Sequence, residues 1–277
     1  MTMPGTNVLL IGPPGSGKTH SIRTLIDAGL EVFCLFTEPG MEVLGDTDID
    51  KLHWHYVPPS QPSWDAMIDN ATKVNSFDAG ALQKMAGMNK REYAQFVDVL
   101  KVCNNFTCQR CGKEFGPIDK FDTNRAFVFD SLSGLNIMLL DLAVGGKPIR
   151  TQPDWGVAID TEEKFLNRLA LGMRAHFVLI SHVDRQVDQV LGGIKLFPAA
   201  LGQKLPPLVS RFFSDVIFTE VEGDKFIWST SHAGLDPKTR NLPIAKSLPP
   251  NFVPILENWK KFGGVVSIPT EKVTENV

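Results

Sequence analysis

The 277-residue sequence contains 43% hydrophobic and 21% charged residues, and its formal net charge is -3. No apolar stretch approaches the ~20 residues that a membrane span requires, and the net charge excludes a globally basic nucleic-acid coat. The opening residues lack the charged-then-apolar pattern of a signal peptide, so we expect a cytoplasmic protein without a membrane partner.

Short apolar runs alternate with helical patterns along the first two thirds of the chain. We expect buried strands at residues 7–11, 31–36, 52–57, 126–130 and 176–182. Amphipathic helices are expected between them, for example where Trp64, Met67, Ile68 and Ala71 recur at helical spacing. Strands that alternate with helices predict an α/β fold with a mainly parallel central sheet flanked by helices.

The later part of the chain is expected to be less regular. Residues 145–156 are predicted to form a loop, and residues 184–211, rich in Gly, Pro, Lys and Gln, an irregular stretch. The segments DVIFTEV and KFIWSTS flank EGD and predict an antiparallel hairpin. Beyond residue 249 we expect one short helix and a polar tail from about Thr270. These patterns predict a core over residues 1–248, with a Cys-rich insertion at 103–122, and a C-terminal extension over 249–277.

A phosphate-binding loop is the strongest motif in the sequence. Residues 12–19 read GPPGSGKT, which matches G-x-x-x-x-G-K-[ST] between a strand and a helix. The glycines let backbone N–H groups surround phosphates, and the helix N-terminus adds partial positive charge. We expect Lys18 to reach the β- and γ-phosphates of ATP and Thr19 to bind Mg²⁺. The predicted nucleotide-binding residues of this segment are Gly12, Pro13, Pro14, Gly15, Ser16, Gly17, Lys18, Thr19 and His20.

Three further strand ends supply candidate catalytic groups. Asp130 ends the apolar run FVFD and is predicted to anchor Mg²⁺. Glu38 follows the strand after the phosphate-loop helix, where P-loop proteins of the additional-strand type carry the glutamate that activates water. No acid directly follows Asp130, which favours Glu38 for this role. His182 ends the next strand and is predicted to sense the γ-phosphate.

The order GPPGSGKT, TEPG, FVFDS and LISH resembles the RecA/RadA core in its compact phage-encoded form. It is similar to phage AAA-domain nucleotide-binding proteins, some of which act as single-strand annealing recombinases. The later segments RTQPDWG, FPAALGQKLPPLVSRFFSDVIF and GLDPKTRNLP add to this resemblance, which covers roughly residues 5–245.

The resemblance implies a ring or filament that binds ATP between neighbouring subunits. Lys238 and Arg240 occupy the place from which basic residues reach the neighbour's γ-phosphate, where a cation stabilises transferring phosphate. The resemblance also implies DNA-binding loops near residues 145–155 and 184–205. Their candidate contacts are Lys147, Arg150, Trp155, Arg185, Lys195, Phe197 and Lys204.

The segment CNNFTCQRCGKEFGPID carries three clustered cysteines, Cys103, Cys108 and Cys111. Cys108-x-x-Cys111-Gly-Lys is typical of a zinc knuckle, and Cys103 is a candidate third ligand. The fourth ligand is open: the candidates are His53, His55, Asp119, Asp122 or a group of a neighbouring subunit. Free thiols are the alternative, whereas a plant-type iron–sulfur cluster needs another downstream cysteine that the sequence lacks.

The leading hypothesis is a Mg²⁺-dependent, DNA-stimulated ATPase of the RecA-like type. As an oligomer it would bind single-stranded DNA and promote annealing or recombination in phage DNA metabolism, in the host cytoplasm, with a single-strand DNA-binding protein as a further candidate partner. One alternative is a nucleotide-gated assembly or regulatory ATPase without DNA pairing activity. Another is a replication helicase loader or motor.

Overall fold

The computed structural model describes residues 3–85, 90–187, 192–236 and 238–268. The strands are β1 (Asn7–Gly12), β2 (Glu31–Phe36), β3 (Leu52–Tyr56), β4 (Arg125–Asp130), β5 (His176–Val187), β6 (Ile194–Pro198), β7 (Asp215–Glu222) and β8 (Lys225–Ser229). The α-helices are α1 (Lys18–Ser21), α2 (Arg23–Asp27), α3 (Trp64–Ser76), α4 (Ala79–Lys84), α5 (Gln95–Asn104), α6 (Leu132–Val144), α7 (Gln152–Gly172), α8 (Pro206–Val209) and α9 (Val253–Lys261).

One mainly parallel sheet organises the described strands, in the order β3-β2-β4-β5-β1-β7-β8. The hairpin of β7 and β8 adds an antiparallel edge, as predicted, and β6 pairs antiparallel with the outer half of β5. β5 lies between β1 and β4, so it is an additional strand between the phosphate-loop strand and the strand that ends at Asp130. The predicted fold class is confirmed.

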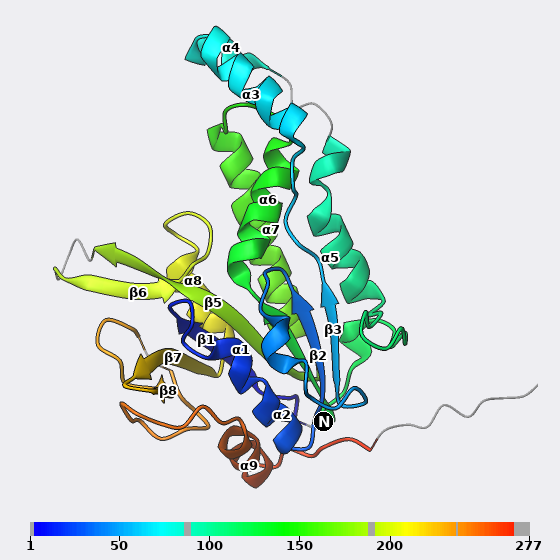
Figure 1. Cartoon of the computed structure of the whole chain (residues 1–277). Helices are drawn as coiled ribbons and strands as arrows, with labels where there is room; N and C mark the ends of the chain where they lie inside the picture. Colours follow the sequence, from blue (N-terminus) through cyan, green and yellow to red (C-terminus); the bar gives the residue numbers. More distant parts are fainter. Residues whose placement is uncertain (1–2, 86–89, 188–191, 237, 269–277) are drawn as a thin grey trace, which may run out of the picture.

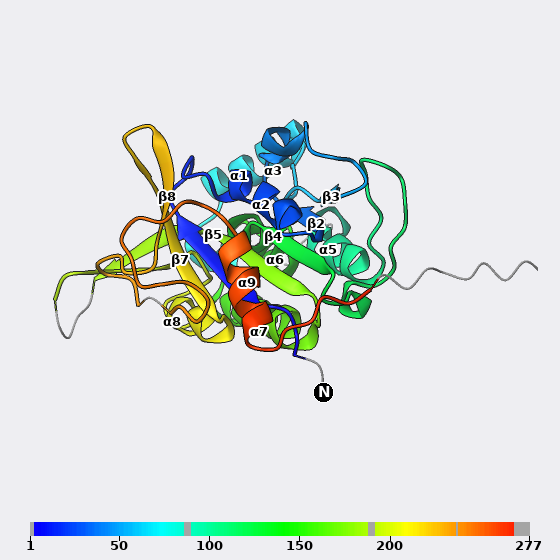
Figure 2. The same ribbon diagram turned by 90° about the horizontal axis from the view of Figure 1, so that it is seen from below.

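Both faces of the sheet are buried because consecutive apolar residues of each strand point to opposite sides. Leu9 and Ile11 of β1 join the core beneath α5, α6 and α7, whereas Val8 and Leu10 join the core beneath α2 and α9. Figures 1 and 2 show these helices as two layers enclosing the sheet. The result is a three-layer α/β/α arrangement.

The register of the sheet brings the expected site residues to one edge. Gly12 pairs with His182, and Asp130 pairs with both Phe36 and Ile180. The carboxyl ends of β1, β2 and β4 therefore lie beside His182 in the middle of β5, and in open α/β sheets this edge is where ligands bind.

The predicted helix around Trp64 is confirmed, but its apolar residues face solvent. No described residue of α3 is buried, and Trp64 is 78% exposed. Figure 1 shows α3 and α4 beyond the ends of α5, α6 and α7, away from the sheet. Helical spacing predicted the local conformation correctly, because spacing depends on the backbone period and not on what covers the helix.

The predicted loop at 145–156 is wrong over its second half. α7 begins at Gln152, because Thr151 and Asp154 form a reciprocal capping box at its start. The Thr151 hydroxyl donates to Asp154 Oδ2 over 2.7 Å, and the Thr151 N–H donates to the same oxygen over 2.8 Å. Pro153 lies in the first turn, where it leaves the helical hydrogen bonds intact.

The predicted irregular stretch at 184–211 is wrong where two strands and a short helix form, and right for residues 199–205, which have no regular structure. β5 continues to Val187 and pairs with β6 from Val183 opposite Pro198 to Val187 opposite Ile194. After residues 199–205, the short helix α8 begins at Pro206. Residues 188–191 lie outside the described part of the chain. This hairpin directly continues the strand that carries His182.

The described part of the C-terminal extension packs on the second face of the sheet. Ile255 and Leu256 of α9 are buried there, and Trp259 Nε1 donates to the Pro4 carbonyl over 2.8 Å. The expected boundary at residues 248 and 249 stays a prediction, and the expected polar tail from Thr270 lies outside the described residues. None of the helices in the described part has the length and apolar character to cross a membrane.

Candidate nucleotide-binding site

The phosphate loop lies between β1 and α1 in a conformation that requires glycine. Gly17 has a φ of +80°, and a Cβ there would lie 2.5 Å from the Phe226 ring. At Gly12 a Cβ would lie 2.2 Å from Thr219 Oγ1 of β7. Ser16 Oγ and Thr219 Oγ1 are 2.7 Å apart, so a hydrogen bond ties the loop to the neighbouring strand.

Lys18 is buried inside this loop. Its Nζ donates to the carbonyl oxygens of Gly12 over 2.9 Å and Pro13 over 2.7 Å. Burial lowers the pKa of Lys18 to about 8, and the carboxylates of Asp130 and Glu38 partly offset that effect. The ammonium group is therefore already placed among oxygen acceptors, at the position where the motif predicts phosphate.

Thr19 and Asp130 place two oxygen atoms side by side that could bind a metal ion such as Mg²⁺. The Thr19 hydroxyl donates to Asp130 Oδ2 over 2.6 Å, which joins the start of α1 to the end of β4. Burial raises the pKa of Asp130 to about 6, while the Thr19 hydrogen bond and the Lys18 charge act in the opposite direction. A hydroxyl beside a buried carboxylate fits Mg²⁺, which prefers oxygen ligands and whose charge would favour the ionised form.

Glu38 is held by one group that follows β4 and by another from β5. Ser131, directly after β4, donates its hydroxyl to Glu38 Oε2 over 2.5 Å, and His182 Nε2 lies 3.3 Å from the same oxygen. The hydrogen bond from His182 is the largest of the effects that lower the pKa of Glu38; burial opposes it and the Ser131 hydrogen bond adds to it. Glu38 is therefore a fixed carboxylate at neutral pH.

One cavity of about 590 Å³ joins these groups. Its lining includes the predicted catalytic and magnesium-binding residues of the sheet edge, Lys18, Thr19, Glu38, Asp130 and His182, and also His20, which was predicted to bind nucleotide. Phe226 of β8 forms another wall, with its ring centroid 5.8 Å from that of His20. The structure thus brings together the residues predicted from four separate sequence segments.

A sequence model described as "AAA domain" matches residues 5–247, which is most of the chain. The chain belongs to the AAA domain family. Among solved structures it is similar to the crystal structure of the RadB recombinase, with 13% sequence identity, a TM-score of 0.33, and coverage of 89% of this chain and 86% of that chain. A search of curated proteins found no relative that matches.

Three residues of this AAA domain's site were not assigned a role from the sequence. Thr37 bonds the backbone of Ser131 twice, with its Oγ1 donating to the carbonyl over 2.7 Å and accepting from the N–H over 3.0 Å. This fixes the turn that carries Glu38 against the end of β4. Ser131 stands beside Asp130 in the sequence, so its position was a usable signal; Phe226 comes from a distant hairpin and gave none.

Lys238 and Arg240 lie elsewhere in the AAA domain. Lys238 pairs with Val216 near the amino end of β7, whereas the phosphate loop follows the carboxyl end of β1. Lys238 Nζ donates to the Arg211 carbonyl over 3.3 Å, and the Arg240 N–H donates to Asp215 Oδ1 over 2.9 Å. The structure does not bring them to the phosphate loop of the same chain, and their role toward a neighbour stays a prediction.

In the first predicted DNA-binding segment, the candidate side chains contact other residues of the same chain. Lys147 Nζ lies 3.0 Å from Asp154 Oδ1, and the Arg150 guanidinium lies over the Trp155 ring, 5.9 Å from its centroid. Trp155 belongs to the first turn of α7 rather than to a loop.

The second predicted DNA-binding segment carries exposed cations on and after the hairpin. Arg185 and Lys204 are exposed, Lys195 pairs with Gln186, and Phe197 is half-buried opposite Asp184. The role of both segments toward DNA stays a prediction.

The cysteine insertion differs from its predicted ligand set. Cys108 and Cys111 group with His53, and their ligand atoms all lie within 4.8 Å of one another. Cys103 lines a separate cavity with Phe165, and burial raises the pKa of its thiol to about 12. His53, one of the open candidates for the fourth ligand, thus takes the place expected for Cys103.

Proposed function

We propose that this AAA domain binds Mg·ATP and hydrolyses it, and that the nucleotide controls how an oligomer of the chain binds single-stranded DNA. One observation supports the chemistry most directly. The Glu38 carboxylate is fixed by Ser131 and His182 in the same cavity as Lys18 and the Thr19–Asp130 pair. A water-activating base, a phosphate-binding cation and a magnesium-binding pair are what an in-line attack on a γ-phosphate requires.

The chain's own residues divide this work as follows. Lys18 provides positive charge within the loop, and Thr19 and Asp130 would hold Mg²⁺, which supplies neutralisation of phosphate charge when bound. Glu38 accepts a proton from the attacking water, and its lowered pKa keeps it ionised for that task. Ser131 and His182 orient the carboxylate. Glu38 is thus oriented by contacts that do not depend on the nucleotide.

The link to DNA runs along β5. His182 contacts Glu38 at the edge of the sheet, and five residues later the same strand ends at Val187 in the hairpin with β6. Figure 1 shows this hairpin extending beyond the body of the sheet. A change in the hydrogen bonds of His182 would therefore act on the first strand of an exposed hairpin that carries Arg185. This continuity supports the proposal that ATP and DNA binding are coupled.

The biological setting belongs to the same proposal. The resemblance to phage annealing recombinases favours annealing or recombination in phage DNA metabolism, with a single-strand DNA-binding protein as a partner. The ATP site would lie between subunits, with Lys238 or Arg240 acting on the neighbour's nucleotide.

Fluorescence anisotropy of labelled single-stranded DNA, together with phosphate release, tests this proposal. We expect salt-sensitive DNA binding in the presence of ATP and turnover that rises when DNA is added. Arg185→Ala should weaken DNA binding and lower the slope of log affinity against log salt by about one, with basal turnover retained. Lys164→Ala is the matched control, because Lys164 is an exposed cation of α7 paired with Asp160.

The alternatives predict a different pattern. No DNA binding at low salt, with turnover unchanged by DNA, would overturn the DNA part of the proposal and favour a nucleotide-gated assembly ATPase. Equal effects of the two substitutions would show that the hairpin does not carry the DNA contact.

A further inference from the structure

We infer that His53, Cys108 and Cys111 bind a zinc ion that fastens the cysteine insertion to the edge of the sheet. The three ligand atoms lie within 4.8 Å of one another, and Cys111 Sγ is 3.6 Å from His53 Nδ1. His53 and Cys108 are buried and Cys111 is partly buried. Two thiols and an imidazole nitrogen are soft and intermediate donors, a combination that favours Zn²⁺ over Mg²⁺ or Ca²⁺.

The backbone around the cysteines has the form of a tight turn that presents both sulfurs to one side. Cys108 N–H donates to the Lys113 carbonyl, and Gly112 N–H donates to the Cys108 carbonyl, each over 2.9 Å. Gly112 has a φ of +74°, which permits this turn directly after Cys111. The Arg110 N–H points at Cys108 Sγ over 3.3 Å, and such a bond stabilises a metal-bound thiolate.

A carboxylate behind His53 orients its ring. Glu31 Oε1 lies 3.3 Å from His53 Nε2, and Arg125 Nε donates to the other Glu31 oxygen over 2.7 Å. With its proton on Nε2, the nitrogen nearer Glu31, the ring leaves the lone pair of Nδ1 facing Cys111. Metal-binding histidines commonly have such a carboxylate partner, which fixes the tautomer and raises ligand basicity. The Glu31–Arg125 pair therefore prepares His53 to bind a metal.

The fourth coordination position is left to water or to a group of a neighbouring chain. Among the described residues, no further His, Cys, Asp or Glu joins the group of three. Glu31 lies on the far side of the imidazole, beside Nε2, so it contacts the His53 ring and does not bind the ion.

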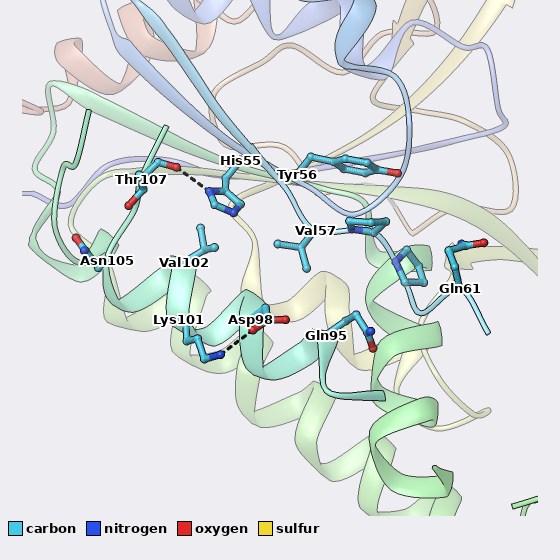
Figure 3. A pocket seen from close by; sticks show the side chains of 12 residues that line it. His55, Tyr56, Val57, Gln61, Gln95, Asp98, Lys101, Val102, Asn105 and Thr107 are labelled. Atoms are coloured by element: carbon cyan, nitrogen blue, oxygen red, sulfur yellow. Dashed lines mark hydrogen bonds and ion pairs between the residues drawn. The ribbon is translucent and has the colours of Figure 1, made fainter. Parts of the chain in front are cut away.

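The zinc would also fix one wall of a groove of about 690 Å³ between β3 and α5. His55 lies two residues after His53 on the same side of β3, and Thr107 directly precedes Cys108. Figure 3 shows His55 and Thr107 joined by a hydrogen bond of 2.7 Å in this wall, with Asp98 and Lys101 of α5 opposite. Loss of the ion should therefore loosen this groove, while the nucleotide cavity beside β1, β2 and β4 stays intact.

Metal analysis of the full chain tests the inference. The chain is purified under reducing conditions without chelator, and zinc is measured by mass spectrometry. We expect one zinc per chain, with loss of that zinc in Cys108→Ser and in His53→Gln. Cys103→Ser is the matched control and should keep the metal, because Cys103 faces a separate cavity.

Cobalt binding covers the case in which a ligand variant fails to fold. Apo-chain refilled with Co²⁺ should show thiolate-to-cobalt absorption in the wild type and in Cys103→Ser. Glu31→Gln keeps all three ligands and should lower zinc affinity about 10- to 100-fold in competition with a chelating dye. ATP binding by the apo-chain serves as the check that the rest of the fold is intact.

Three results would overturn the inference. The first is wild-type protein without zinc that also fails to bind Co²⁺. The second is zinc retained at full stoichiometry by folded Cys108→Ser, and the third is zinc lost from folded Cys103→Ser, which would restore the ligand set read from the cysteine spacing.

Discussion

The hydrogen bond from His182 is the main cause of the low pKa of Glu38. Without it, burial would act against ionisation with less opposition, so His182→Ala should raise the pKa of Glu38. Because the carboxylate form accepts the proton from water, the acid limb of the turnover-against-pH profile should move to higher pH. His55→Ala, on β3 and outside the nucleotide cavity, is the control. An acid limb that does not move would separate His182 from the ionisation of Glu38.

Glu162 of α7 carries another buried carboxyl group. Its Oε2 accepts from the Leu201 N–H over 2.9 Å, and burial raises its pKa from 4.5 to about 8. Between these values the folded chain holds a proton that the unfolded chain releases. The contribution of Glu162 to the free energy of unfolding should therefore be complete below pH 4.5. It should fall by at most about 1.4 kcal/mol per pH unit as the pH rises to 8.

Glu162→Gln should remove this contribution while keeping an acceptor for Leu201. Urea midpoints at pH 5, 6.5 and 8 should decline less steeply in the variant than in the wild type. Glu163→Gln, at the neighbouring and less buried position, is the control. Parallel declines in wild type and Glu162→Gln would show that Glu162 is not protonated in the folded chain.

At the scale of elements, the β7–β8 hairpin supplies a wall of the nucleotide cavity. The Phe226 ring covers Gly17 and lies beside His20. Phe226→Ala should weaken ATP binding about 5- to 10-fold, since it removes apolar surface worth ~1 kcal/mol. Val221→Ala is the matched control, because Val221 stands opposite Phe226 in the hairpin but does not line the cavity. Calorimetric titration that gives equal affinities for both variants would contradict this role.

The elements that the sequence predicted well are those with local signals. The phosphate loop is an eight-residue pattern, and apolar runs precede Asp130 in β4 and Ser181 and His182 in β5. The start of α7 was missed although Thr151 and Asp154 supply a capping box and Pro153 stands in the first turn, where proline is tolerated. β6 was missed because its partner, not its own composition, makes it a strand.

The group of His53, Cys108 and Cys111 shows which contacts cannot be predicted from residues close together in the sequence. Cysteine spacing favoured Cys103, which lies five residues from Cys108 but on α5 and turned into another cavity. His53 is 55 residues from Cys108 and reaches it only because the insertion folds onto β3, where Gln109 N–H donates to the Trp54 carbonyl over 2.9 Å. Contacts of that kind depend on the whole sheet, so spacing alone could name His53 only as one candidate among several.

At the scale of the whole molecule, the account requires neighbouring chains to share an ATP site. Arg240 is exposed and lies away from the chain's own phosphate loop. A mixture of Arg240→Ala and Glu38→Gln, each inactive alone, should recover part of the turnover, because some interfaces then combine an intact Glu38 with an intact Arg240. A mixture of Lys18→Ala and Glu38→Gln should stay inactive, since both positions belong to one chain's cavity. Full turnover by Arg240→Ala alone would contradict a role in trans.

The most direct test of the central claim is ATP turnover by Glu38→Gln. The amide keeps the size of the side chain but cannot accept a proton from water. We predict a fall in phosphate release of about 100-fold or more, with the affinity for ATP little changed, because Lys18, Thr19 and Asp130 are intact. Turnover at the wild-type rate by a folded, ATP-binding Glu38→Gln chain would contradict the account.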